Sequence, residues 1–138
     1  MTLNEKNLVQ GTFAQVAPIG EVAAELFYGR LFEIDPELRS MFRGDMKDQG
    51  RKLMQILAVA VKSLDRLHEI LGVAREMGHR HAGYGVRNEH YDTVAAALLW
   101  TLEKALGDGF TPDVKAAWVS LYTALATAMK SGAMEMAA

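Results

Sequence analysis

The chain has 138 residues, a length typical of a single domain, and half of its residues are hydrophobic, so it can bury a sizeable core. Its 15 Lys and Arg residues and 17 Asp and Glu residues leave a net charge of −2, which argues against nucleic-acid binding. Cysteine is absent, which excludes disulfides and thiolate-bound metals. The N-terminal segment lacks the pattern of a secretory signal and no apolar run is long enough to cross a bilayer, so we expect a cytoplasmic protein without a membrane span.

Apolar residues recur every three to four positions along most of the chain, which is the period of amphipathic helices, and no stretch alternates as a strand would. Pro18 stops the first expected helix. Asp35 followed by Pro36 combines an N-cap residue with the residue favoured in the first helical turn. In the first half of the chain we therefore expect helices over 4–16, 21–34, 36–42 and 49–63, with a polar corner at 43–48.

The second half of the chain carries similar signals. Gly83 and Gly85 can supply positive φ in a turn at 82–86, and Asn88 is the expected cap of the helix that follows. After a glycine-rich break at 107–109, Thr111 and Pro112 repeat the cap-then-proline pattern. We expect helices over 65–81, 88–106 and 114–130, an end of the last helix at Ser131 and Gly132, and a frayed tail at about 132–138.

Helices of unequal length, joined by two short and sharp corners, predict one all-α domain over residues 1–138. An up-and-down bundle of equal helices needs no such corners. The globin fold, a three-over-three helical sandwich around a haem pocket, has unequal helices that cross at about 50° and suits the pattern better. Helical periodicity alone leaves both arrangements open.

His81 stands at the end of an expected helix, directly before the glycine-containing turn, and its imidazole could leave the helix end and enter an interior cleft. Tyr28 and Phe32 are four residues apart and share a helix face. A haem iron needs one neutral imidazole and an apolar slot, and neutral donors such as tyrosine and glutamine suit a polarised gas ligand. The sequence therefore indicates a candidate haem site. Its other candidate residues are Phe42, Gln49, Lys52, Leu53, Met77, Val86 and Tyr91.

Taken singly, each candidate has a simpler interpretation, as a core side chain, a buried tyrosine with a satisfied hydroxyl or an exposed residue at a helix start. His68 lies among charged residues and is expected on the surface. His79 and His90 lie so close to His81 that spacing alone does not choose the ligand. The candidates gain weight because they lie at compatible places on separate helices.

Five ordered motifs stand out: FYGRLFEIDPELRSMF at 27–42, QGRKLMQIL at 49–57, GHRHAGYGV at 78–86, EHYDTV at 89–94 and AAWVSLY at 116–122. With these motifs the chain resembles bacterial single-domain globins and the globin part of flavohaemoglobins, with some likeness to neuroglobin. The resemblance runs from about Glu5 to about Met129. QGRKLMQ together with GHRHAGYGV is similar to the tight oxygen-binding globins of methane-oxidising bacteria.

This resemblance implies a haem b protein in which His81, and not His79, is the proximal ligand. Tyr28 and Gln49 would be the distal donors to a bound gas. The remaining candidates would line the haem: Phe42 packed on it, Leu53 as the distal aliphatic wall, Met77, Val86 and Tyr91 around it, and Lys52 or Arg80 at a propionate.

One departure from the family pattern concerns the proximal side. In flavohaemoglobins the proximal histidine belongs to a hydrogen-bonded set with a tyrosine and a glutamate. Tyr91 matches the tyrosine, but the position of the glutamate holds Ala133, and Glu135 is offset by two residues. An anionic partner would raise electron donation to the iron. Its absence weakens the case for peroxidase-like or very fast dioxygenase chemistry.

The leading expectation is therefore reversible binding of dioxygen, with nitric oxide and carbon monoxide as related ligands. The main alternative is a nitric oxide dioxygenase that forms nitrate. Because no reductase segment follows Ala138, this enzyme would take its electrons from a separate reductase. A haem sensor and a haem-free helical domain are further alternatives.

Overall fold

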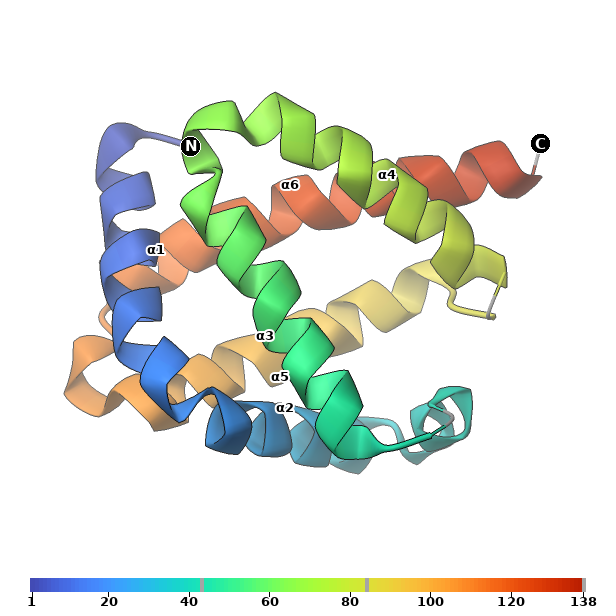
Figure 1. Cartoon of the computed structure of the whole chain (residues 1–138), viewed down its shortest axis with the longest axis horizontal. Helices are drawn as coiled ribbons and strands as arrows, with labels where there is room; N and C mark the ends of the chain where they lie inside the picture. Colours follow the sequence, from blue (N-terminus) through green and yellow to red (C-terminus); the bar gives the residue numbers. More distant parts are fainter. Residues whose placement is uncertain (43, 84, 138) are drawn as a thin grey trace.

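The structure is a computed structural model that describes the backbone of residues 1–42, 44–83 and 85–137 and the side chains as far as Met134. Within these residues the chain forms six α-helices and four short 3-10 helices, and no strand (Figure 1). The α-helices are α1 (Leu3–Val16), α2 (Gly20–Ile34), α3 (Met46–Lys62), α4 (Leu67–Gly83), α5 (Asn88–Leu106) and α6 (Pro112–Ala137). The 3-10 helices are η1 (Ala17–Ile19), η2 (Pro36–Met41), η3 (Leu64–Arg66) and η4 (Gly107–Gly109).

Several helices begin where the sequence predicted a cap. Asp35 Oδ1 accepts a 3.2 Å hydrogen bond from the backbone N–H of Glu37 at the start of η2. The Thr111 hydroxyl accepts a 3.2 Å bond from the N–H of Val114 at the start of α6. These bonds satisfy N–H groups that have no partner within the helix. The predicted caps Asp35 and Thr111, and the end of α1 before Pro18, are confirmed, although α6 begins at Pro112, two residues before the expected start.

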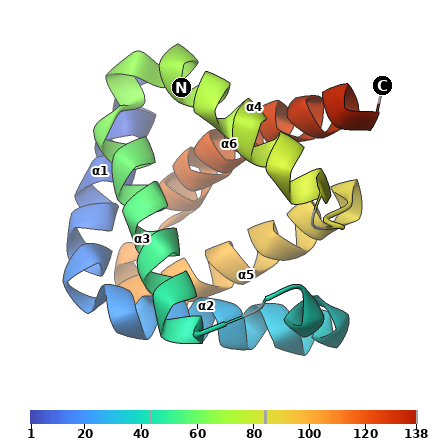
Figure 2. The same ribbon diagram turned by 45° about the vertical axis from the view of Figure 1, so that its right-hand side comes forward.

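The helices form two layers. Helices α1, α3 and α4 lie in front of α5 and α6 in Figure 1, and α2 runs along the lower edge beside α5. In both views the C-terminal end of α4, the start of α5 and the η2 segment lie on the same side of the molecule (Figures 1 and 2). This is the expected three-over-three arrangement. None of the described helices combines the length and the hydrophobicity needed to cross a bilayer.

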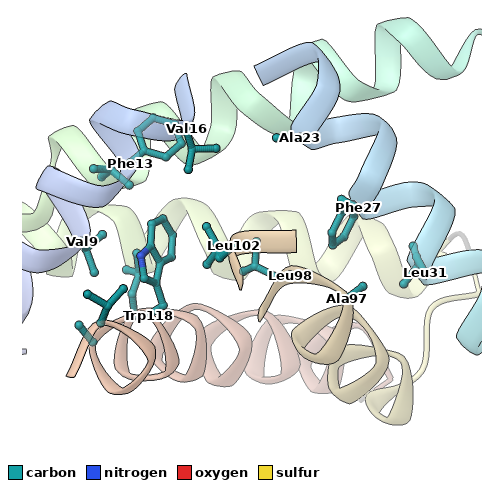
Figure 3. Packing of buried hydrophobic residues seen from close by; sticks show 14 of the residues in the cluster. Val9, Phe13, Val16, Ala23, Phe27, Leu31, Ala97, Leu98, Leu102 and Trp118 are labelled. Carbon is teal, nitrogen blue, oxygen red and sulfur yellow. The ribbon is translucent and has the colours of Figure 1, made fainter. Parts of the chain in front are cut away.

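The core lies between the two layers, where side chains from α1, α2, α5 and α6 meet (Figure 3). The rings of Phe13 and Trp118 lie 6.4 Å apart, and Trp118 is 1% exposed. The indole N–H of Trp118 donates a 2.9 Å hydrogen bond to the hydroxyl of Thr12, which donates in turn to the carbonyl of Leu8 at 2.7 Å. The buried polar atoms of this pair therefore have partners, and the bond joins the first helix to the last.

Two glycines bring the backbones of α4 and α6 into direct contact. A Cβ atom at Gly78 would overlap the backbone of Met129, and one at Gly132 would overlap the backbone of Arg75. No residue larger than glycine fits at either place without a shift of a helix. The contact therefore holds α4, which carries His81 near its end, at a fixed distance from α6.

Two expected helix boundaries are wrong by three residues or more, and α4, expected over 65–81, runs from Leu67 to Gly83. Helix α3 begins at Met46 and not at Gln49, because Asp45 Oδ1 caps it by accepting a 2.9 Å bond from the N–H of Lys47. Arg43, at the start of the expected corner, lies outside the described residues. Helix α6 continues through Ser131 and Gly132 to Ala137, because Gly132 makes the contact with α4 and does not terminate the helix. Of the expected tail, Ala138 lies outside the described residues.

The segment before α5 also differs from the expectation. Helix α4 continues to Gly83, so of the two glycines in the expected turn only Gly85 takes a positive φ, of 92°. Tyr84, within the expected turn, lies outside the described residues. Asn88 is not the cap of α5. The Nδ1 atom of His90 accepts a 2.9 Å hydrogen bond from the backbone N–H of Arg87, the residue that precedes α5, and so gives this N–H group a partner.

Candidate functional site

Three aromatic side chains, which we call the aromatic wall, form a cluster where α2 meets the end of η2. The ring centroids of Tyr28 and Phe42 lie 5.3 Å apart and those of Phe32 and Phe42 lie 5.5 Å apart, both edge to face. Tyr28 and Phe32 stack at 6.1 Å, as their shared helix face predicted. Asp35 and Pro36 stop α2 and turn the chain, which returns Phe42 to the side of Tyr28. Edge-to-face pairs of this kind contribute about 0.5–1.5 kcal/mol each beyond their buried area.

The hydroxyl of Tyr28 lies at the junction of α2 and α3. It is 3.5 Å from the backbone carbonyl oxygen of Gln49, which is long for a hydrogen bond from a hydroxyl. Burial raises the pKa of Tyr28 to about 12, so the hydroxyl keeps its proton at neutral pH and acts as a donor. The structure therefore brings Tyr28 and Gln49 together, through the backbone of Gln49. The Gln49 side chain is half-buried at the same junction.

His81 lies near the end of α4, and its ring is held by its own helix. Its Nδ1 atom is 2.7 Å from the backbone carbonyl oxygen of Met77, one turn earlier. A carbonyl oxygen only accepts, so Nδ1 carries the proton in this contact and Nε2 is the nitrogen with the lone pair. Metal-binding histidines generally show this arrangement, in which one ring nitrogen donates to a carbonyl while the other coordinates.

The other three histidines have different surroundings. His68 and His79 are exposed. His90 is 4% exposed, but its Nδ1 atom is occupied by the N–H of Arg87 at the start of α5. The spacing of the histidines left open which of them is the candidate ligand, and the surroundings of their rings favour His81.

Tyr91 lies in α5 with 5% of its surface exposed, and its hydroxyl has no hydrogen-bond partner among the described residues. Its backbone carbonyl accepts a 2.6 Å bond from the hydroxyl of Tyr122, and the Lys130 ammonium lies 5.7 Å from its ring centroid. Burial raises the pKa values of both tyrosines. A buried hydroxyl without a partner costs about 1–3 kcal/mol, so the Tyr91 hydroxyl fits a site completed by another group. Tyr122 was not predicted as a site residue, and its place in the AAWVSLY motif is the one feature that could have indicated it.

The remaining predicted residues divide into apolar and charged ones. Leu53 is half-buried against the core. Met77 and Val86 are also half-buried, and Val86 is tied to His81 by a 3.1 Å bond from its N–H to the His81 carbonyl. Lys52 and Arg80 are exposed, so they belong to a rim and not to an interior wall.

Two surface pockets have linings that do not include His81. One, of about 790 Å³, lies between α2 and α3, and its lining includes Tyr28 and Phe32 but not His81. The other, of about 710 Å³, lies between α4 and α6 and contains none of the predicted site residues. The first pocket therefore touches the back of the aromatic wall, and the second has no connection with the site.

Comparison with known proteins identifies the family. The family model of the globins matches residues 25–129, which is most of the chain.

The chain belongs to the globin family.

This globin is 32% identical over 124 residues to a flavohemoprotein of Bacillus subtilis, an alignment that covers 88% of the chain and 31% of the relative. It is 32% identical over 130 residues to a flavohemoprotein of Rhizobium meliloti, with 91% and 32% covered. The chain thus spans about a third of the length of these curated relatives. Neuroglobin-2 of Oncorhynchus mykiss is 27% identical over 146 residues, with 96% of the chain and 92% of the relative covered.

A solved structure with the same fold is that of a hexacoordinated heme protein from an anhydrobiotic tardigrade. Its TM-score is 0.87, at 14% identity, with 97% of the chain and 96% of the other protein covered. The all-α globin fold expected from the helix pattern is therefore confirmed, and so is the resemblance to bacterial globins.

Proposed function

We propose that this globin binds haem b through His81 and binds dioxygen reversibly. The observation that carries the proposal is the 2.7 Å contact between His81 Nδ1 and the Met77 carbonyl, which assigns the lone pair to Nε2 and restricts rotation of the ring. The names of the flavohemoprotein relatives, which match at 32% identity, support a haem group. Haem, when bound, supplies an iron atom that takes a diatomic gas as a ligand.

The side chains of this globin have distinct roles in the proposal. Phe42 and Leu53 exclude water from the gas side, and Met77 and Val86 do so on the side of His81. Tyr28 and Gln49 donate hydrogen bonds to a polarised gas, for which Tyr28 stays protonated at neutral pH. Lys52 or Arg80, both exposed, would meet the acidic groups at the edge of the haem.

Tyr91 supports the choice of gas binding over rapid redox chemistry. Its hydroxyl is buried and has no partner in the described part of the chain, so it can bond to a group at the completed site. The position of the family glutamate holds Ala133, and the side chain of Glu135 lies outside the described residues. The ammonium of Lys130 lies over the Tyr91 ring. A cation at this place does not raise electron donation by the imidazole as a carboxylate would.

Reconstitution of the full chain with haem tests the proposal. We expect one haem per chain, an intense band near the blue edge of the visible spectrum, and a shift of this band when oxygen is added to the reduced protein. Removal of oxygen under inert gas should restore the reduced spectrum. A chain that takes up no haem, or that is oxidised at each exposure to oxygen without a reversible spectrum, would contradict the proposal.

The similarity to flavohemoproteins favours a second candidate, a nitric oxide dioxygenase. The reaction joins nitric oxide and dioxygen into nitrate and takes up one electron per turnover, which a separate reductase would supply. Nitric oxide consumption by the loaded protein, with NADH and a flavin reductase, distinguishes the two candidates. Consumption of many equivalents per chain supports the enzyme, and consumption of one equivalent supports the oxygen-binding protein.

A further inference from the structure

The pocket of about 790 Å³ between α2 and α3 reaches the proposed gas-binding tyrosine from the outside of the molecule. Its volume is many times the ~30 Å³ that one water molecule occupies in the liquid, so it has ample room for a diatomic molecule. Small residues make up much of its lining, among them Gly20, Ala24, Gly29 and Gly50. Charged residues, among them Glu21, Glu25, Lys47 and Arg51, are exposed around it.

Tyr28 belongs both to this pocket and to the aromatic wall. Its ring meets Phe42 at 5.3 Å on the wall, and the same side chain lines the pocket. Helices α2 and α3 meet closely where Gly50 faces Ala24, since a Cβ atom at Gly50 would lie 2.9 Å from that of Ala24. The pocket lies between these two helices, and the side chains of Tyr28 and Phe32 are part of its lining.

The hydroxyl of Tyr28 is held weakly for a buried group. Its contact with the Gln49 carbonyl is 3.5 Å long, whereas hydroxyl donors usually approach to about 2.7–2.8 Å. Stacking and edge contacts with Phe32 and Phe42 set the ring plane without a strong directional bond to the hydroxyl. The contact of the Tyr28 hydroxyl therefore offers little resistance to a displacement of the ring.

We propose that the pocket between α2 and α3 is the route by which neutral diatomic gases reach the gas side of the site, with the Tyr28 ring as its gate. This proposal rests on the proposed function. It predicts that a side chain placed in the pocket changes the rates of gas uptake and release without changing affinity, because it does not contact the bound gas.

Gly29 is the best position for the test. It lines the pocket, and a Cβ atom built there meets no atom within 4 Å. Phenylalanine at this position would occupy the pocket and would also raise helix propensity, so Gly29→Phe should fold. Gly11 in α1 and Gly72 in α4 have equally open surroundings and provide the controls Gly11→Phe and Gly72→Phe.

The measurement is carbon monoxide recombination after photolysis, together with carbon monoxide release, in the haem-loaded full chain. We expect Gly29→Phe to slow both rates by the same factor of about ten, which corresponds to a barrier higher by ~1.4 kcal/mol. Affinity should be unchanged, and the two control variants should match the native protein. An unchanged association rate in a folded Gly29→Phe variant would refute the route alone. A native protein that takes up haem and binds no carbon monoxide would refute the proposed function and the route with it.

Xenon provides a second measurement that does not depend on any variant. Xenon binds where apolar side chains exclude water, so crystals of the native protein under xenon pressure should show it at the apolar end of the pocket, against Tyr28 and Phe32. Xenon bound only at other places would overturn the proposal.

Discussion

Gly78 of α4 lies directly against the backbone of Met129 of α6, with no space for a Cβ atom between them. The equivalent contact from the other helix places Gly132 against the backbone of Arg75. Helices usually approach to about 8–10 Å between axes, and a contact without side chains brings them to the short end of this range. The position of α4, and with it that of His81, is thus determined by two glycines.

We predict that Gly78→Ala lowers the free energy of unfolding by about 1–3 kcal/mol or more, because the added methyl group overpacks the contact. Gly72→Ala in the same helix is the matched control, since its surroundings are open. It should raise the free energy of unfolding by about 0.5–1 kcal/mol through helix propensity. Urea unfolding measures both. Equal effects of the two substitutions would show that α4 does not approach α6 as described.

His81 is predicted to be the only histidine required for haem retention. His81→Ala should abolish the haem absorption spectrum of the reconstituted protein, because the lone pair on Nε2 is lost. His79→Ala should leave the spectrum unchanged, because His79 is exposed. The assignment is wrong if the His79 variant loses haem and the His81 variant keeps it.

Oxygen release should depend strongly on Tyr28 and Gln49, and carbon monoxide release should not. Each hydrogen bond to a charged acceptor is worth roughly 1.5–3 kcal/mol, and each 1.4 kcal/mol is about tenfold in affinity. Tyr28→Phe and Gln49→Leu should therefore each accelerate oxygen release by about tenfold or more. Carbon monoxide is less polarised and serves as the internal control in stopped-flow measurements. Equal acceleration of both gases would mean that the Tyr28 hydroxyl and the Gln49 amide do not donate to the bound gas.

The protein should lose stability at alkaline pH through its buried tyrosines. Burial raises the pKa of Tyr28 from 10.0 to about 12 and also raises that of Tyr122, so the native state holds these protons more tightly than the unfolded state. The stabilisation is fully present below pH 10 and is lost as the pH rises through 12. Between pH 10 and 12, the free energy of unfolding of Tyr28→Phe should fall less than that of the native protein, by at most ~2–3 kcal/mol. Urea unfolding along a pH series measures this difference. A variant that follows the native curve would mean that the Tyr28 hydroxyl is hydrated.

Local chemistry made much of the fold predictable. A cap residue followed by proline determines a boundary within a few residues, as Asp35 and Thr111 do, so the start of η2 was predicted correctly and that of α6 to within two residues. The shared helix face of Tyr28 and Phe32 followed from their spacing and is confirmed by their stacking. Spacing was sufficient in each case because the interaction lies within one helical turn or one corner.

One error arose where a residue acts across helices, and others arose where a local cap was not recognised. Glycine often ends a helix, but Gly132 lies within α6 and makes the contact with α4. Nothing in the local sequence distinguishes these two roles. His90 was one of three histidines that spacing could not separate, and only its bond to Arg87 shows that it caps a helix. The contact of the Tyr28 hydroxyl with the Gln49 backbone likewise depends on where α3 begins. The assignment of Tyr28, Gln49 and His81 to a haem stays a prediction.

The hydrogen bond from Trp118 to Thr12 also has a consequence for biosynthesis, because its two residues are 106 positions apart. Ribosomes add about 5–20 residues per second, so Thr12 is synthesised several seconds before Trp118, which carries its indole donor. During this interval the apolar face of α1 lacks the α6 side chains that cover it in the finished core. A nascent chain halted before Trp118 should therefore expose Val9, Phe13 and Val16 to chaperones, and release from the chaperone should coincide with the emergence of α6.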